Sequence, residues 1–171
     1  QLLYHDVASW NALISGYSCD ARHAGKALSC LYQMQCQGIT PDIITFVCTL
    51  KACSSIGAFD KGKEIHIKII VKGLLKEEVF VGNALMDMYV KCSNVKNAQF
   101  LFQRNPNLDV VMWNVIIAAS AKKGNFKDAF ELHDRMKLEG VIPNKITFLS
   151  IFNACSGVTA LERARQMHVC M

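Results

Sequence analysis

Asparagine side chains that recur at a fixed place are the groups in this sequence best suited to ligand chemistry. Asn11 and Asn114 follow a tryptophan in two matching strings, VASWNALISGY and VVMWNVIIAAS. Asn83 holds the equivalent place in a third string, VFVGNALMDMYVKC. An amide offers donors and an acceptor, so these side chains could bind a hydrogen-bonding ligand. Asparagine near a helix start also often bonds the backbone, which leaves a structural role open.

A second set of polar residues stands just before predicted helices. Asp42 and Asn144 close the strings GITPD and GVIPN, in which a glycine ends one helix and a proline blocks its continuation. Asp109 stands in the same relation to the helix expected from residue 110. A short polar side chain there can accept hydrogen bonds from free N–H groups, so all three are predicted N-caps. Capping does not exclude contact with a ligand.

The elements that position these residues belong to a long internal repeat. The string IITFVCTLKACSSIGAFDKGKEIH at 43–66 returns as KITFLSIFNACSGVTALERARQMH at 145–168, at a constant offset of 102 residues. The identical residues are Ile44, Thr45, Phe46, Ala52, Cys53, Ser54, Ala58 and His66, with Ile146, Thr147, Phe148, Ala154, Cys155, Ser156, Ala160 and His168 as their counterparts. Such self-similarity predicts a repeat architecture.

Successive units of this repeat are each predicted to form two helices. Apolar residues at helical spacing, such as Trp10, Ile14 and Tyr17, define one face of a helix. A single pair of amphipathic helices cannot cover both apolar faces, whereas stacked pairs can. The predicted fold is therefore all-α: an α-α superhelix, or solenoid of helix-turn-helix repeats, with an inner groove. Its parts are 1–6 (the tail of a preceding unit), 7–42, 43–78, 79–109, 110–144 and a truncated 145–171.

Composition and motifs argue against catalysis and metal binding. The 19 Lys and Arg exceed the 14 Asp and Glu, and the surplus of +5 suits a polyanionic partner without identifying one. No two cysteines are separated by only two residues, no H-x-E precedes paired cysteines, and no glycine-rich phosphate loop carries a lysine. His66 and His168 recur without ligands at metal spacing. We expect no catalytic residue, no cofactor and no metal site.

The cysteines indicate a reducing, intracellular environment. They are too sparse for a small secreted disulfide scaffold, so reduced and mostly buried thiols are expected. They are Cys19, Cys30, Cys36, Cys48, Cys53, Cys92, Cys155 and Cys170. No apolar run approaches the roughly 20 residues of a membrane helix, so no membrane partner is expected. The start at Gln1, without a targeting segment, favours a piece of a longer protein.

Several recurring strings point to a known family. W-N-x-[LI]-I, G-[IV]-x-P-[DN], T-F-x-x-x-x-x-A-C-S and G-N-A-L-x-D-M-Y-x-K-C resemble the pentatricopeptide repeats, specifically the plant subclass that alternates P, L and S variants. Units 7–42 and 110–144 resemble P repeats, 43–78 and 145–171 resemble L repeats, and 79–109 resembles an S repeat. The sequence departs from this pattern by an extra residue around 18–25 and by the charged run at 76–78.

The resemblance implies that pairs of polar residues select RNA bases. In the family, the fifth residue of the first helix and the last residue of the unit make each pair. Ionised aspartate only accepts hydrogen bonds and matches the N3–H of uracil, whereas an asparagine NH₂ suits the bare N3 acceptor of cytosine. We therefore expect uracil at the first and third units, and cytosine with tolerated uracil at the fourth. The pairs are Asn11 with Asp42, Asn83 with Asp109, and Asn114 with Asn144.

The resemblance also implies residues that clamp the bases and contact the phosphates. Val47 and Leu149 stand at the selecting position of the L units and cannot hydrogen-bond, so they are expected to space the array. Lys91 and Lys122 are the expected phosphate partners, although plain solvated charges would explain them too. The clamp is expected at the second residue of each unit, where packing between helices is the alternative: Ala8, Ile44, Phe80, Val111 and Ile146.

These features together favour sequence-specific binding of single-stranded RNA. The resemblance implies a parent protein that acts in C-to-U editing or processing of transcripts in the mitochondrion or chloroplast, with other editing factors as further partners and no small-molecule substrate. The editing chemistry would belong to a C-terminal extension, because these repeats carry no deaminase motif. The alternative is a protein-interaction scaffold that binds peptides, as tetratricopeptide arrays do.

Overall fold

The computed structural model describes residues 6–77, 79–105, 108–122 and 124–154, and all of its regular elements are helices. The chain divides into two compact units, the first ending at Leu101 and the second beginning at Phe102. Among the described helices, none is both long and apolar enough to cross a bilayer. Residues 1–5 of the predicted tail (1–6) and residues 155–171 of the last repeat lie outside the described residues.

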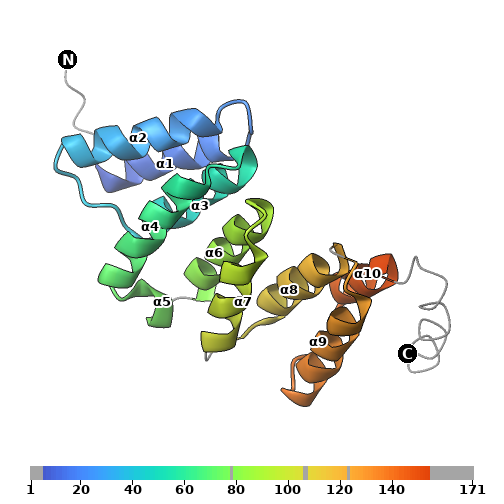
Figure 1. Ribbon diagram of the computed structural model, residues 1–171. Helices are drawn as coiled ribbons and strands as arrows, with labels where there is room; N and C mark the ends of the chain where they lie inside the picture. The colour runs from blue at the N-terminus through green and yellow to red at the C-terminus, as the bar shows by residue number, and fades with distance from the viewer. Residues whose placement is uncertain (1–5, 78, 106–107, 123, 155–171) are drawn as a thin grey trace. The chain divides into compact units, whose positions relative to one another are not determined.

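The first compact unit contains three successive helix pairs, the last of which runs past its boundary (Figure 1). The helices that begin repeats, α1, α3 and α6, pack side by side, since α3 contacts both α1 and α6. The second helices cover them: α2 packs on α1 and α3, and α4 packs on α3 and α6. The bounds are α1 Val7–Ser18, α2 Ala24–Cys36, α3 Ile43–Ile56, α4 Phe59–Val71, α5 Leu74–Glu77, α6 Val79–Lys91 and α7 Val95–Arg104.

The second compact unit repeats this arrangement once. Helix α8 (Val110–Lys122) packs against α9 (Phe126–Leu138), and α10 (Lys145–Ala154) packs against both. Its core is centred on Trp113, whose ring meets Phe102 edge-on with centroids 4.6 Å apart. The Arg135 guanidinium lies 5.7 Å from the Trp113 ring, where a cation is attracted to the aromatic face. Trp10 and Trp113 are both buried, which confirms their predicted place in the core.

Helix ends follow the predicted local chemistry. Gly38 and Gly140 have φ of 74° and 78°, in the left-handed region that favours glycine. The residue after each glycine donates its backbone N–H to a carbonyl in the last turn of the helix: Ile39 to Met34 and Val141 to Met136, both at 3.0 Å. The proline strings therefore end helices as expected.

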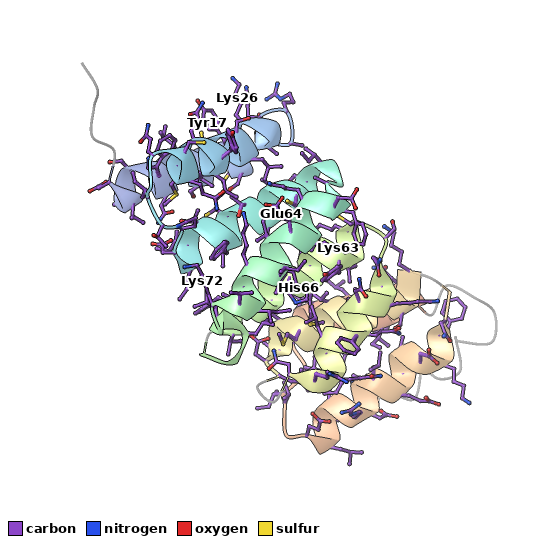
Figure 2. The ribbon with its side chains drawn as sticks, turned by 60° about the vertical axis from the view of Figure 1, so that its left-hand side comes forward. Tyr17, Lys26, Lys63, Glu64, His66 and Lys72 are labelled. Carbon is purple, nitrogen blue, oxygen red and sulfur yellow. The ribbon has the colours of Figure 1, made fainter. Side chains whose placement is uncertain are left out.

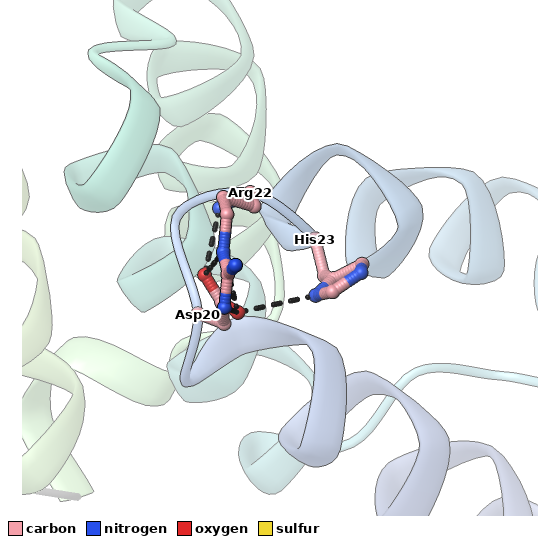
Figure 3. A network of polar contacts seen from close by, with 3 residues as sticks. All are labelled: Asp20, Arg22 and His23. Carbon is pink, nitrogen blue, oxygen red and sulfur yellow. Dashed lines mark hydrogen bonds and ion pairs between the residues drawn. The ribbon is translucent and has the colours of Figure 1, made fainter.

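The two departures from the repeat pattern, around 18–25 and at 76–77 of the charged run, correspond to a hydrogen-bonded turn and a short helix. At the first, Asp20 sits in the turn between α1 and α2 and accepts hydrogen bonds from Arg22, while the His23 ring lies 3.2 Å away (Figure 3). The Arg22 side chain, more than any other contact, holds the pKa of Asp20 below its usual range. At the second, the short helix α5 bridges α4 and α6. Extra residues are thus accommodated at the ends of helices, where they do not disturb the stack.

The prediction of mostly buried cysteines is wrong for the described residues. Only Cys53 is buried, and burial raises the pKa of its thiol to about 12. Cys19 and Cys36 are exposed, and the remaining described cysteines, Cys30, Cys48 and Cys92, are half-buried. Helix phase explains the difference: in α2 the buried stripe consists of Ala27, Leu31 and Met34, and the cysteines fall outside it. Cys155, Cys170 and His168 lie outside the described residues.

His66 is half-buried and has a structural partner. Its Nδ1 lies 2.8 Å from the Tyr89 hydroxyl, and the two rings meet edge-on at 5.6 Å. Burial lowers the pKa of His66, which favours the neutral ring. This side chain, labelled in Figure 2, therefore joins α4 to α6 through Tyr89.

Two glycines provide a matched test of this backbone. Gly38→Ala should destabilise the chain by about 1 kcal/mol or more, because its φ of 74° strains an L-residue although open space surrounds it. Gly16→Ala should instead stabilise it by about 0.5–1 kcal/mol, because Gly16 lies within α1 with equally open space. Thermal unfolding followed by circular dichroism measures both. Equal effects of the two substitutions would contradict the left-handed assignment.

Candidate functional site

Two first helices, α1 and α8, carry a polar site near their N-terminal ends. In α1, the second turn brings Asn11 beside Asp42, the residue that precedes α3. The Asn11 Nδ2 donates to both carboxylate oxygens of Asp42, at 3.0 Å to Oδ1 and 2.9 Å to Oδ2. This bond joins the first helix of the repeat 7–42 to the last residue of the same repeat, 31 positions away. The first predicted selecting pair is in direct contact.

Thr45 completes this cluster. Its hydroxyl donates to Asn11 Oδ1 at 2.6 Å and lies 2.9 Å from Asp42 Oδ1, while it accepts the Asp42 backbone N–H at 3.2 Å. The Thr45 N–H in turn bonds Asp42 Oδ1 at 2.9 Å, which makes a reciprocal capping box at the start of α3. The amide is therefore held on both sides: its NH₂ faces the carboxylate and its oxygen faces the hydroxyl.

The same cluster recurs in the second compact unit. Asn114 Nδ2 donates to Asn144 Oδ1 at 3.1 Å, and the Thr147 hydroxyl donates to Asn114 Oδ1 at 2.5 Å. Asn144 Oδ1 also accepts the backbone N–H groups of Ile146 and Thr147, at 3.0 and 3.1 Å. Asn144 thus caps α10 through its oxygen, and its NH₂ points away from these contacts. The second complete pair reproduces the geometry of the first.

The remaining predicted pair is split between the two compact units. Asn83 is half-buried in α6 of the first unit. Asp109 belongs to the second, where its carboxylate accepts the Met112 N–H at 2.9 Å and caps α8. Capping by Asp42, Asp109 and Asn144 is confirmed in each case.

Burial divides the cluster into an inner and an outer part. Asn11 and Asn114 are only 8% and 6% exposed, and Thr45 and Thr147 are fully buried. Asp42 is half-buried and Asn144 is exposed. Burial alone would raise the pKa of Asp42, but hydrogen bonds from Thr45 and Asn11 outweigh it and hold that pKa below its usual range. Asp42 is therefore an ionised acceptor at neutral pH.

The predicted clamp residues are all exposed. Each is the second residue of its helix, and the larger ones are Ile44 (57% exposed), Phe80 (72%), Val111 (47%) and Ile146 (58%). Ala8 is exposed as well. Packing between helices, the alternative explanation for these apolar residues, does not account for side chains this accessible. Val47 is half-buried and Leu149 is exposed.

A hollow of about 620 Å³ lies beside the first pair, within the roughly 300–1,000 Å³ typical of ligand sites. It is lined by Pro41, Asp42, Ile43, Ile44, Lys72 and Leu74. Lys72 is the C-cap residue that follows α4 (Figure 2), and it was not predicted because the predicted phosphate contacts, Lys91 and Lys122, both lie in first helices. One hollow thus combines the carboxylate predicted to select a base, a residue predicted to clamp it, and a cation.

The predicted phosphate contacts differ from each other. Lys91 pairs with Asp87 one helical turn away, at 2.9 Å, so a phosphate would compete with this carboxylate. Lys122 is exposed and lines a hollow of about 310 Å³ together with Ala118, Ala121, Ser150 and Asn153. Of the two, Lys122 is the better placed cation. Among the described residues, no group of three or more His, Cys, Asp or Glu could hold a metal ion.

This geometry defines a class of protein: an array of helical hairpins in which two first helices, α1 and α8, carry a polar pair and each first helix exposes its second residue. Sequence comparison supplies the family. The model of the PPR repeat family matches residues 5–55 and 108–157, which is more than half of the chain. The chain belongs to this pentatricopeptide repeat family, a non-enzymatic family of RNA-binding proteins.

Curated relatives from Arabidopsis thaliana are much longer than this chain. Pentatricopeptide repeat-containing protein At2g33680 is 39% identical over 158 residues, which cover 92% of the chain and 22% of the relative. The chloroplastic protein At3g57430 is 39% identical over 162 residues, covering 88% and 18%, and the mitochondrial protein At3g02330 is 34% identical over 155, covering 91% and 17%. The chain spans about a fifth of the length of these relatives.

Solved structures establish the fold. PPR10 from maize matches with a TM-score of 0.74 and 23% identity over 99% of the chain and 24% of PPR10. PPR10 in complex with an 18-nucleotide psaJ RNA element matches with a TM-score of 0.81 and 18% identity, over 95% and 24%. The predicted all-α repeat fold is confirmed, and the chain is an array related to a protein that binds RNA.

The electrostatics of the first cluster can be tested by stability measurements. Because the pKa of Asp42 is lowered in the fold, its contribution to stability is present above the ordinary pKa of aspartate and is lost as the pH falls through the lowered value. Asp42→Asn should therefore reduce the acid dependence of the unfolding free energy. The reciprocal Asn144→Asp should increase it, since the same cluster then holds a carboxylate. Urea unfolding between pH 3 and pH 7 measures this, and superimposable pH profiles would contradict the assignment.

Proposed function

We propose that this chain binds single-stranded RNA in a sequence-specific manner and belongs to a longer protein of the PLS subclass. That parent protein acts in C-to-U editing or processing of transcripts in a plant mitochondrion or chloroplast, together with other editing factors. The organelle names of the relatives and the RNA complex of PPR10 support the compartment and the ligand. The alternation of P, L and S strings in the sequence supports the subclass.

A single observation carries the proposal: in the two complete clusters, the branch of the capping side chain that the helix start does not use is chemically opposite. In both, Oδ1 of the capping residue is engaged by the backbone of the new helix. The other branch is an acceptor in Asp42, whose Oδ2 bonds Asn11, and a donor in Asn144, whose second branch is an NH₂ group. An acceptor matches the N3–H of uracil and a donor matches N3 of cytosine. The preferred base thus depends on whether the second branch of the capping side chain, which does not bond the helix start, accepts or donates a hydrogen bond.

The exposed second residues supply the complementary apolar contacts. A base splayed out of a single strand can lie against Ile44 while its edge faces Asp42, since both residues line one hollow. Lys72 at the same hollow supports a phosphate contact. In this scheme Asn11, Asp42, Asn114 and Asn144 select bases, and the repeat register assigns the same roles to Asn83 and Asp109. Val47 and Leu149 space the L repeats.

Exchanging the capping residues should exchange the preferred bases. Asp42→Asn should move the preference at the first repeat from uracil towards cytosine, and Asn144→Asp should move the fourth towards uracil. Each change is expected to be roughly tenfold, since one good base contact contributes about 1–3 kcal/mol of discrimination. Selection from a randomised RNA pool followed by sequencing measures the preference without assuming a binding register.

The matched control for this exchange is Asp20→Asn. It removes the same charge from an exposed turn, where Asp20 pairs with Arg22 rather than with a selecting asparagine (Figure 3). Its base preference should equal that of the unaltered chain. A similar shift in the control, or none in Asp42→Asn, would contradict the proposed pairs. Indifference to RNA together with capture of peptides would favour a protein-binding scaffold instead.

The clamp is best tested at its aromatic member. Phe80→Ala should weaken RNA binding by about 10- to 100-fold, because stacking of a base on an aromatic side chain contributes roughly 1–3 kcal/mol. Tyr32→Ala is the control: Tyr32 is an aromatic residue of similar exposure (67%) in the second helix α2. Fluorescence anisotropy with labelled RNA compares the two variants. Equal weakening by both would argue against a dedicated clamp position.

A further inference from the structure

We propose that the hydroxyls of Thr45 and Thr147 are positioning groups that orient the selecting asparagines, so that loss of the hydroxyl lowers base discrimination. This inference rests on the proposed function and adds a determinant to it. Neither threonine is exposed, so neither can touch RNA itself. Each bonds the asparagine of the preceding P repeat, at a separation of 34 residues for Thr45 and 33 for Thr147.

Each threonine hydroxyl has one proton to donate, and one of its two possible acceptors is nearer than the other. Thr45 Oγ1 lies 2.6 Å from Asn11 Oδ1 and 2.9 Å from Asp42 Oδ1. Thr147 Oγ1 lies 2.5 Å from Asn114 Oδ1 and 3.3 Å from Asn144 Oδ1. In both clusters the threonine hydroxyl therefore donates its hydrogen bond to the asparagine oxygen. With that oxygen engaged, the NH₂ group of the asparagine faces the capping residue.

The two clusters do not depend on the hydroxyl equally. Asn11 is also held by an ionised carboxylate, through two contacts of 2.9 and 3.0 Å. Asn114 has a single contact of 3.1 Å to a neutral amide oxygen. Charge-assisted hydrogen bonds are roughly twice as strong as neutral ones. Removing the hydroxyl should therefore loosen Asn114 more than Asn11.

A purely structural role would give a different pattern. Both threonines also accept the backbone N–H of the capping residue, at 3.2 Å from Asp42 and 3.0 Å from Asn144. Loss of this capping bond should cost the two helices similar stability. A capping role thus predicts similar consequences for both variants, whereas a positioning role predicts unequal base discrimination.

Valine and serine substitutions separate these roles. Thr147→Val should reduce the preference of the fourth repeat for its base from roughly tenfold to about twofold, and Thr45→Val should reduce that of the first repeat by a smaller factor. Thr147→Ser and Thr45→Ser retain the hydroxyl and should restore both preferences. Selection from a randomised RNA pool measures all four variants, and circular dichroism reports whether each is folded.

A second measurement is independent of RNA. The side-chain NH₂ signals of Asn114, followed by NMR, should shift and broaden in Thr147→Val and recover in Thr147→Ser. If the unaltered chain discriminates between bases while both valine variants keep its preferences, the positioning role is overturned and RNA recognition stands. Unchanged Asn114 signals in Thr147→Val would also overturn it. If the unaltered chain shows no base preference, the proposed function itself fails.

Discussion

One hydrogen bond joins the stability of this array to its site: the bond from an asparagine amide in one first helix to the residue that caps the next. A helix start leaves N–H groups without partners within the helix, so a polar acceptor must precede it. Asp42 and Asn144, the last residues of their repeats, meet that need for the next repeat and also bond Asn11 and Asn114 of their own repeat. In a repeat protein, each unit is stabilised chiefly by its neighbours. The cap is therefore both a local signal and an interface between repeats.

Adjacent residues at the start of one helix take opposite environments because of helical geometry. Ile44 is exposed and Thr45 is buried, and the same contrast separates Ile146 from Thr147. Successive side chains on a helix point about 100° apart, so one turn can present an apolar group outward and a hydroxyl inward. Within three residues, the chain thus provides a capping acceptor, an exposed apolar side chain and a buried hydroxyl that bonds the asparagine.

The sequence predicted what depends on neighbouring residues and missed what depends on stacking. Caps at Asp42, Asp109 and Asn144 followed from glycine, proline and polar residues within a few positions, and the buried tryptophans followed from helical spacing. Thr45 and Thr147 were visible as recurring residues, but their partners lie more than 30 positions away and meet them only once repeats stack. Cysteine burial was predicted wrongly because a residue-type preference was applied without helix phase, which places Cys36 outside the buried stripe of α2.

Capping restricts what the outward atom of such a site can be. The helix start engages one branch of the capping side chain, so a residue that also contacts a ligand needs a second branch. Asp and Asn have this forked shape, and they differ only in whether the second branch accepts or donates. Serine or threonine caps as well, but its single oxygen would have to serve the helix and the ligand together. A site built on a helix start is therefore biased towards two residues of nearly equal shape and opposite hydrogen-bonding character, so that specificity can change between repeats without any change in the fold.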